Sequence, residues 1–306
     1  MTELQSTPAG APAPAVQRDR RDRITLSWML GVPLLIVIGV VLIPTVLTII
    51  LSFSSWDGIG GVDSITWIGT QNYTNAVEAY PPFQQALHNN VLWLVFLFVG
   101  PTILGILLAV VLDRNIAGTR IYQSVLFTPV VLSMALVGII WQFVYSTDYG
   151  VLNSVLGSDT DWLGDPDYNI WAVMIAAGWR HTGYIMILYI AGLKAIDGSV
   201  REAAKVDGAG PIRTFFQIVF PLMLPTNLMV AVVTVIESIR AFDLVWVINR
   251  GRNGLELIST LVTSNIIGEA GRVGFGSALA VVMLLISAVF IAAYVWIITR
   301  GDGTEE

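Results

Sequence analysis

The chain contains no cysteine, only two histidines and few charged residues, and each shortage excludes a class of function. Without cysteine there are no disulfides, thiolate nucleophiles or cysteine metal sites. His88 and His181 alone are too few for a multi-histidine metal site, so we predict no metal and no catalytic residue. Charged residues make up 12% of the chain, whereas soluble domains have about 25%. The net charge of −6 argues against binding to nucleic acid.

The sequence also lacks the Gly-Lys-Ser/Thr run that a P-loop requires. Its only lysines, Lys194 and Lys205, follow a leucine and an alanine. The chain therefore has no ATP site of this kind, and no cofactor is predicted for it. If ATP drives its function, a partner chain must hydrolyse it.

Apolar residues are abundant, at 55% of the chain with a mean hydropathy of +0.73. A helix needs about 20 apolar residues to cross a bilayer. Six stretches meet this length, and they predict an all-α integral membrane protein with six transmembrane helices. The predicted spans are 27–53, 91–112, 121–145, 170–193, 222–248 and 276–298. Prolines inside the first three spans are tolerable because neighbouring helices can satisfy the freed carbonyls.

The distribution of Lys and Arg predicts the orientation, because cytoplasmic loops are enriched in both. Loops 54–86 and 146–169 have neither residue, whereas the 113–120 turn and the 194–220 loop are basic. Both termini are therefore predicted to be cytoplasmic. One predicted outer loop, 249–275, opposes the rule with three arginines, Arg250, Arg252 and Arg272.

The domain prediction follows from these spans. Residues 1–23 are predicted to be a disordered cytoplasmic tail, because they are rich in Ala, Pro, Gln and Thr before they turn basic. Residues 24–300 form the transmembrane domain, and residues 301–306 form a second cytoplasmic tail.

Charged residues inside predicted spans mark functional positions, because they are costly in lipid. The fourth span contains Arg180 and His181, and the fifth contains Glu237, Arg240 and Asp243 at a helical spacing of three. Two interpretations stay open, an ion-pair lock between the two helices and a polar pathway for substrate. The predicted pathway residues are Arg180, His181, Tyr184, Glu237, Ser238 and Arg240.

The segment 199–225 is the longest polar interruption in the second half of the chain. Ser199 followed by Glu202 predicts a capping box, so a helix is expected to begin there. Gly208 can end that helix, and Pro211 suits the first turn of the next one. We predict a short helix, a glycine bend and a second helix between the fourth and fifth spans.

This segment resembles the EAA signature of bacterial ABC importer permeases, in the form found in the binding-protein-dependent sugar permeases of the maltose type. The matching residues are Glu202-Ala203-Ala204, Asp207-Gly208-Ala209, Phe215, Ile218, Pro221 and Pro225. Two departures from the family pattern are Asp197, where proline is usual, and the run 250–254 in place of a Gly-Gly-Pro run.

The resemblance implies a cytoplasmic coupling helix that docks on an ATPase. The implied coupling residues are Glu202, Ala203, Ala204, Asp207, Gly208, Ala209 and Arg213. It also implies a bacterial plasma-membrane importer of a di- or oligosaccharide. The implied partners are a second homologous permease, an ATPase dimer that uses ATP and Mg, and an extracytoplasmic substrate-binding (lipo)protein.

Three alternatives stay open at this point. The importer could take another polar solute, such as a glycerol phosphate. The chain could be a self-contained secondary carrier, although neither inverted repeats nor matching broken helices are evident in it. An intramembrane enzyme using Arg180, His181, Glu237 and Asp243 is the third, and no recognised catalytic spacing supports it.

Overall fold

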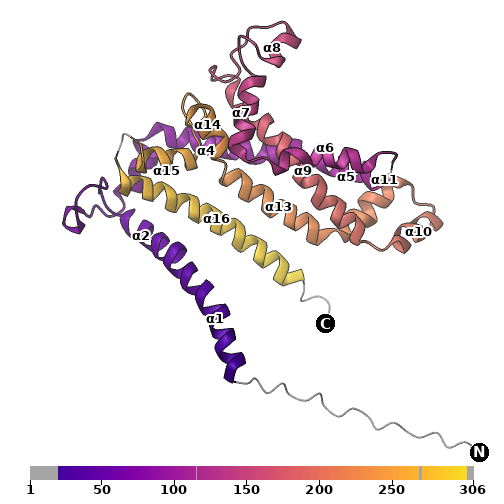
Figure 1. Cartoon of the computed structure of the whole chain (residues 1–306), viewed down its shortest axis with the longest axis horizontal. Coiled ribbons are helices and arrows are strands. Elements are labelled where there is room, and N and C mark those ends of the chain that lie inside the picture. The colour runs from indigo at the N-terminus through magenta and orange to yellow at the C-terminus, as the bar shows by residue number, and fades with distance from the viewer. Residues whose placement is uncertain (1–19, 115, 269–270, 302–306) are drawn as a thin grey trace, which may run out of the picture. The chain divides into compact units, whose positions relative to one another are not determined.

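The computed structural model describes residues 20–114, 116–268 and 271–301, and Figure 1 gives their order. The described residues form helices and loops, with one isolated bridge between Ser54 and Trp67 and no strand among them. Residues 1–47 and 48–306 form two compact units. Most of the predicted N-terminal tail, 1–19, and nearly all of the C-terminal tail, 302–306, lie outside the described residues.

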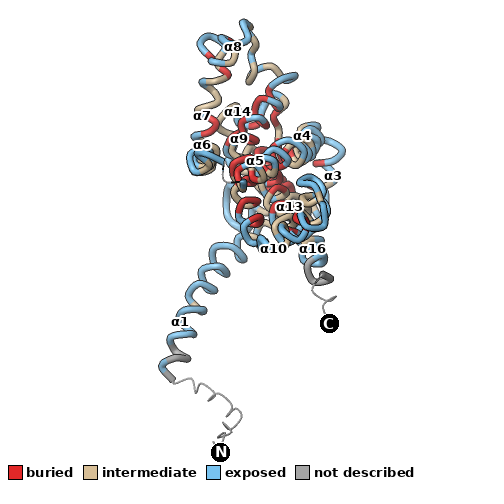
Figure 2. The backbone as a smooth tube through the Cα atoms, turned by 90° about the vertical axis from the view of Figure 1, so that its right-hand side faces the viewer, coloured by how far each residue is buried: buried red, intermediate tan, exposed pale blue. Residues whose placement is uncertain are grey.

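The first predicted span corresponds to one helical run that begins earlier than expected. It consists of α1 (Arg20–Val37), a π-helical turn η1 (Ile38–Leu42) and α2 (Ile43–Leu51). The run continues through Pro33 and Pro44, and the π turn lies directly before the second proline. A π turn is one way in which a helix absorbs a disrupted hydrogen bond. Nearly all described side chains of α1 are exposed, as the pale blue tube in Figure 2 shows.

The second predicted span is a longer helix than expected, from Pro81 to Asp113. It is built from α4 (Pro81–Leu97), a π turn η3 (Phe98–Thr102) and α5 (Ile103–Asp113). Pro101 lies inside this π turn. In the first span, Pro44 likewise lies close to a π turn, just after η1. The helix therefore stays continuous despite its proline.

The fourth and sixth predicted spans are also long helices. They correspond to α9 (Asn169–Ala195) and α16 (Val273–Gly301). Shorter elements lie in the loops between the long helices. These are η2 (Val62–Ser64), α3 (Gln71–Glu78), α8 (Val151–Leu156) and α15 (Ile258–Ile266).

The third predicted span is not one straight helix. It consists of α6 (Thr119–Val131) and α7 (Met134–Val144), which meet at a bend of 104°. Leu132 and Ser133 between them are extended, and the Ser133 hydroxyl accepts a hydrogen bond from the Leu136 N–H to cap α7. Pro129 lies in the last turn of α6. The prediction of an unbroken helix over 121–145 is wrong because the chain is re-capped there.

The fifth predicted span is also broken. The segment Pro211–Leu222 contains α11 (Pro211–Thr214), η4 (Phe215–Val219) and α12 (Phe220–Leu222), and it meets the following segment at 76°. Beyond it, α13 (Leu224–Ile239) ends at Arg240, and α14 (Asp243–Asn249) begins after a short break. At this break the Ala241 carbonyl accepts a hydrogen bond from the Ser259 hydroxyl. The prediction of a continuous helix over 222–248 is therefore wrong.

By length and composition, three described helices could each cross a membrane, and six spans result if each bent pair counts as one. The apolar side chains on their outer faces are exposed, such as Val289 on α16 at 68%. A soluble protein rarely exposes so much contiguous apolar surface, whereas lipid would cover it. The fold is an all-helical membrane protein, and the orientation of its termini stays a prediction.

Helix α9 lies at the centre of the second unit, where most of the buried residues gather (Figure 2). It packs closely on α5, because a Cβ on Gly105 of α5 would lie 2.8 Å from the Ile185 side chain and 3.0 Å from the Thr182 carbonyl. A Cβ on Gly183 of α9 would collide with the Leu126 carbonyl of α6. Small residues allow such close approach between membrane helices.

The loops of the second unit gather in two groups. Asn89 of α4 donates hydrogen bonds of 2.7 and 2.8 Å to the carbonyls of Gly254 and Glu256. The Gly274 N–H donates to the Trp56 carbonyl, so the 249–275 loop lies against the 54–57 segment. The three predicted outer loops thus meet, because Asn253 also contacts the Gly164 carbonyl. The basic loop with α10 (Gly198–Val206) lies at the other end of this unit, beside α5 (Figure 1).

A Gly183→Ala substitution tests the central packing. The added methyl group would meet the Leu126 carbonyl, and such overpacking typically costs about 1–3 kcal/mol. We expect a lower midpoint of thermal unfolding for the purified protein in detergent. Gly100→Ala is the matched control, because a Cβ at Gly100 meets nothing within 4 Å. Equal stability of the two variants would contradict close packing of α9 on α6.

Candidate functional site

A cavity of about 350 Å³ lies between α9, the end of α13 and the start of α14. Its wall combines aromatic, apolar, hydroxyl and charged side chains. The lining residues are Trp93, Leu97, Ser133, Met134, Ala177, Arg180, His181, Ile236, Glu237, Arg240, Ala241, Phe242, Asp243 and Leu244. The volume is within the usual range for a small-molecule pocket.

The breaks in the helices shape this cavity. Arg240 is the C-cap of α13, and Phe242 is the N-cap of α14, so Glu237 and Asp243 belong to different helices. The predicted spacing of three along a single helix is therefore wrong beyond Arg240. The α6–α7 bend likewise places Ser133 and Met134 in the wall.

Arg180 and Glu237 form the closest ion pair in the cavity, with 4.0 Å between Nη1 and Oε1. This distance is at the limit for an ion pair. The Arg180 side chain is 24% exposed and the Glu237 side chain is 40% exposed. The Arg180 Nε is buried and has no hydrogen-bond partner among the described residues. The pair is therefore a loose one, with hydrogen-bonding capacity left over.

His181 is more deeply placed than Arg180. It is 4% exposed, and its Nε2 lies 3.2 Å from the hydroxyl of Thr234 on α13. Thr234 is fully buried and donates to the Val230 carbonyl. This contact joins α9 to α13, so His181 holds the two helices together at the edge of the cavity.

Two predicted pathway residues are not in the cavity wall. Ser238 is 1% exposed, and its hydroxyl donates to the Val235 carbonyl of its own helix. Tyr184 packs against the apolar cluster around Ala109 and Tyr189 instead. Both lie outside this cavity, and their place on a substrate pathway stays a prediction.

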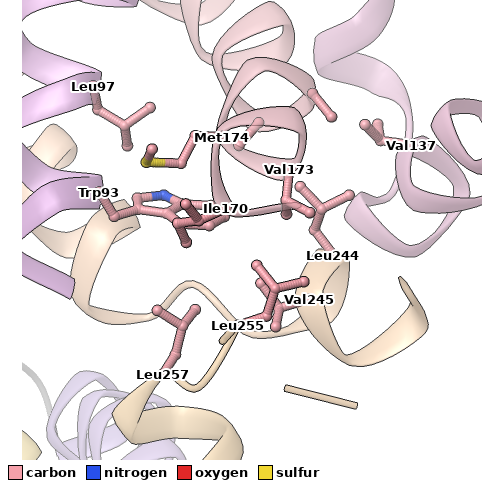
Figure 3. Close-up of a cluster of buried hydrophobic side chains, with 12 residues drawn as sticks. Trp93, Leu97, Val137, Ile170, Val173, Met174, Leu244, Val245, Leu255 and Leu257 are labelled. Carbon is pink, nitrogen blue, oxygen red and sulfur yellow. The ribbon is translucent and has the colours of Figure 1, made fainter. Parts of the chain in front are cut away.

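The sequence pattern did not indicate the apolar and hydroxyl part of the wall. Trp93, Leu97 and Leu244 belong to both the cavity wall and the buried cluster in Figure 3. Trp93 lies in the second predicted span, which contains no charged residue that would mark it as functional. Ser133, at the N-cap of α7, could have been found as a capping residue four positions after Pro129.

The helix α10 begins differently from the prediction. Its N-cap is Asp197, whose carboxylate accepts a hydrogen bond of 2.9 Å from the Ser199 N–H. Hydrogen bonds from the backbone and side chain of Ser199 hold the pKa of Asp197 below its ordinary value. Ser199 is thus the second residue of the helix, and the predicted Ser199–Glu202 capping box is wrong. Asp and Ser are equally good caps, and Asp197 comes first in the chain.

The bend after α10 follows the predicted pattern. Gly208 has a φ of 73°, and the Ala209 N–H donates to the Ala204 carbonyl, which is how glycine ends many helices. Pro211 lies in the first turn of α11. Arg213 donates from Nε to the Gln217 side chain at 2.8 Å.

The bend also presents a mixed surface to solvent. Glu202, Ala203 and Asp207 are exposed, whereas Ala204 is 3% exposed and faces the protein. Val206 is 87% exposed and Ile212 is 76% exposed. The bend therefore leaves apolar as well as charged side chains uncovered.

A family model described as the binding-protein-dependent transport system inner membrane component matches residues 101–301. The chain is 30% identical over 253 residues to the xylose/arabinose import permease protein XacH of Haloferax volcanii, covering 80% of this chain and 79% of that one. It is 32% identical over 328 residues to the diacetylchitobiose uptake system permease protein NgcF of Streptomyces coelicolor, covering 98% and 91%.

A solved structure shares the fold. It is a bacterial ABC transporter involved in the import of the acidic polysaccharide alginate, with a TM-score of 0.78 and 18% sequence identity. The match covers 92% of this chain and 96% of that chain. The family match and the relatives together are sufficient to assign the chain: it belongs to the inner membrane components of binding-protein-dependent ABC transporters.

Proposed function

We propose that this chain is the permease subunit of an ATP-driven importer for a di- or oligosaccharide. The observation that supports this most directly is the cavity between α9, α13 and α14. It contains aromatic faces and both hydrogen-bond donors and acceptors, and α9 leads from it to the polar bend after α10. Relatives named for xylose/arabinose and for diacetylchitobiose support a carbohydrate substrate, and of these only diacetylchitobiose is a disaccharide.

The cavity chemistry suits a neutral, hydroxyl-rich solute. Phe242 is partly exposed and offers apolar ring surface for sugar C–H faces, whereas Trp93, at 2% exposed, lies behind the wall. Two arginines, Arg180 and Arg240, are balanced by Glu237 and Asp243, so the lining has no excess of either charge. A phosphate or other anion would favour an excess of positive charge. For this reason we prefer a sugar to a glycerol phosphate.

The bend after α10 would receive the driving force. In this proposal its exposed face, with Glu202, Val206 and Ile212, docks on a partner ATPase that binds ATP and Mg. The remaining partners are a second homologous permease and an extracytoplasmic substrate-binding protein, which delivers the sugar. The segment is cytoplasmic in this arrangement, and the host membrane is a bacterial plasma membrane.

The substrate class is tested by a ligand screen on the cognate binding protein. Calorimetric titration with neutral sugars, sugar acids, glycerol phosphates, amino acids and peptides covers the alternatives. We expect a neutral di- or oligosaccharide to bind most tightly. Tightest binding of an amino acid, a peptide or a glycerol phosphate would contradict the proposed substrate.

A Glu202→Ala substitution tests the coupling role. Glu202 is exposed, so the fold should tolerate the change. Losing a charged hydrogen-bonding group at a docked interface costs roughly 1.5–3 kcal/mol, so we expect ATP-dependent sugar uptake into proteoliposomes to fall about tenfold or more. Glu78→Ala, an exposed acid on α3 among the other group of loops, is the matched control. Uptake that persists in Glu202→Ala, or that occurs without the ATPase, would favour a secondary carrier.

Comparing Arg180→Gln with Glu237→Gln tests whether these two side chains contact the sugar or only form an ion-pair lock between α9 and α13. If they contact the sugar, each variant should raise the apparent KM for the delivered sugar about tenfold or more, because a hydrogen bond to a charged group is worth roughly 1.5–3 kcal/mol. Thermal stability should change little, since the pair is loose and partly exposed. The opposite pattern, lower stability with an unchanged KM, would identify an ion-pair lock. Arg120→Gln, exposed at the start of α6, is the control.

A further inference from the structure

Arg201, at the start of α10, joins three helices at one point. Its Nη1 donates a hydrogen bond of 2.6 Å to Oδ2 of Asp113, the last residue of α5. Its Nη2 donates a hydrogen bond of 3.1 Å to the carbonyl of Leu193, in the last turn of α9. We call Arg201, Asp113 and the Leu193 carbonyl the three-helix junction.

The physical chemistry of helix ends explains this arrangement. The last four carbonyls of a helix have no partner within it, and the C-terminal end has a partial negative charge. A carboxylate such as Asp113 is therefore unfavourable at that end unless a cation lies beside it. Arg201 supplies the cation for α5 and a donor for α9. The planar guanidinium can do both at once, whereas an ammonium group acts as a point charge.

The junction is partly shielded from water. The Asp113 side chain is 12% exposed and that of Arg201 is 33% exposed. They line a cavity of about 340 Å³ together with residues of the bend, including Lys205, Ala209 and Pro211. The pair is thus more than a solvated surface ion pair, which would contribute little.

The helices that meet at the junction are also packed along their length. Ala109 and Leu112 of α5 share a buried cluster with Ile185, Tyr189 and Leu193 of α9. Only Ile196 and Asp197 separate α9 from α10. After α10, Val219 belongs to the same buried cluster and Phe215 packs against it, so the following segment also contacts α5 and α9. A Cβ at Gly198, Gly208 or Gly210 would meet nothing within 4 Å, so neither end of α10 is tightly enclosed. The hydrogen bonds of Arg201 therefore supply a direct link from α10 to both helices.

We propose that Arg201 and Asp113 are positioning residues that make α10 move as one rigid body with α5 and α9. This inference rests on the proposed function, in which force enters at α10. Arg180 lies 13 residues before Leu193 on α9, which is roughly 20 Å along a helix. A displacement of α10 would then shift the α9 side of the sugar cavity directly.

The first test uses the complete importer in proteoliposomes and measures sugar imported per ATP hydrolysed. In Asp113→Ala and Arg201→Ala we expect the ATPase to co-purify and to hydrolyse ATP, while sugar per ATP falls about fivefold or more, the lower end of typical coupling energies. Arg201→Lys should lie between these variants and the wild type. Arg120→Ala, an exposed arginine at the start of α6 that does not line this cavity, is the matched control. Lower stability with unchanged sugar per ATP would overturn the proposal, because it would indicate a purely structural role.

The second test exploits the absence of cysteine from the chain. In an Asp113→Cys/Arg201→Cys double variant, a short bifunctional thiol reagent can bridge α5 to α10 at the junction alone. If the two helices move together, bridging should restore the sugar imported per ATP that the double variant has lost. If bridging stops transport, α10 swings relative to α5 during the cycle and the proposal is wrong.

Different results would contradict the role of the junction and the proposed function. Loss of coupling in Glu202→Ala but not in Asp113→Ala would overturn the junction alone. Sugar uptake by the wild-type importer without ATP would contradict the proposed function, and with it any role of the junction in coupling.

Discussion

Close backbone packing around α9 is the constraint on which the rest of the structure depends. In a membrane the lipid is as apolar as the side chains, so helices associate through tight packing and polar contacts instead of the hydrophobic effect. Gly105 lets α5 approach α9, Gly183 lets α6 approach it, and Gly192 accommodates Thr226 of α13. Because α9 is fixed from three sides, its Arg180 and His181 have defined positions in the cavity wall.

The broken helices determine where the polar groups go. A continuous fifth span would have placed Glu237, Arg240 and Asp243 on one helix, and a straight third span would have kept Ser133 inside a helix. The breaks leave backbone groups unpaired at membrane depth, where each costs several kcal/mol unless it finds a partner. The Ser259 hydroxyl at Ala241 and the Ser133 cap of α7 satisfy two of them. The backbone around the cavity can therefore depart from the helix without leaving these groups exposed to lipid.

The cavity and the three-helix junction differ in how they hold their charges. In the cavity the Arg180–Glu237 pair is long, and part of the guanidinium lacks a partner, so the wall can exchange contacts with a solute. At the three-helix junction the Arg201–Asp113 contact is short, and the same guanidinium also caps α9. A loose pair suits binding and release, whereas a tight one suits transmission of movement. Helix α9 connects them.

The sequence by itself determined the features that depend on neighbouring residues. Long apolar runs predicted the membrane helices, Gly208 and Pro211 predicted the bend after α10, and the EAA residues indicated the family. Only the tertiary structure decided which residues meet. The break at Arg240 has no proline or glycine to announce it, and the carbonyl it frees is paired by Ser259, 18 positions further along the chain. Asp113 and Arg201 are 88 residues apart, and Trp93 and Ser133 become cavity residues only because α4 and α7 border the same space. Local propensity is a property of a short segment, whereas these contacts depend on how separate helices pack.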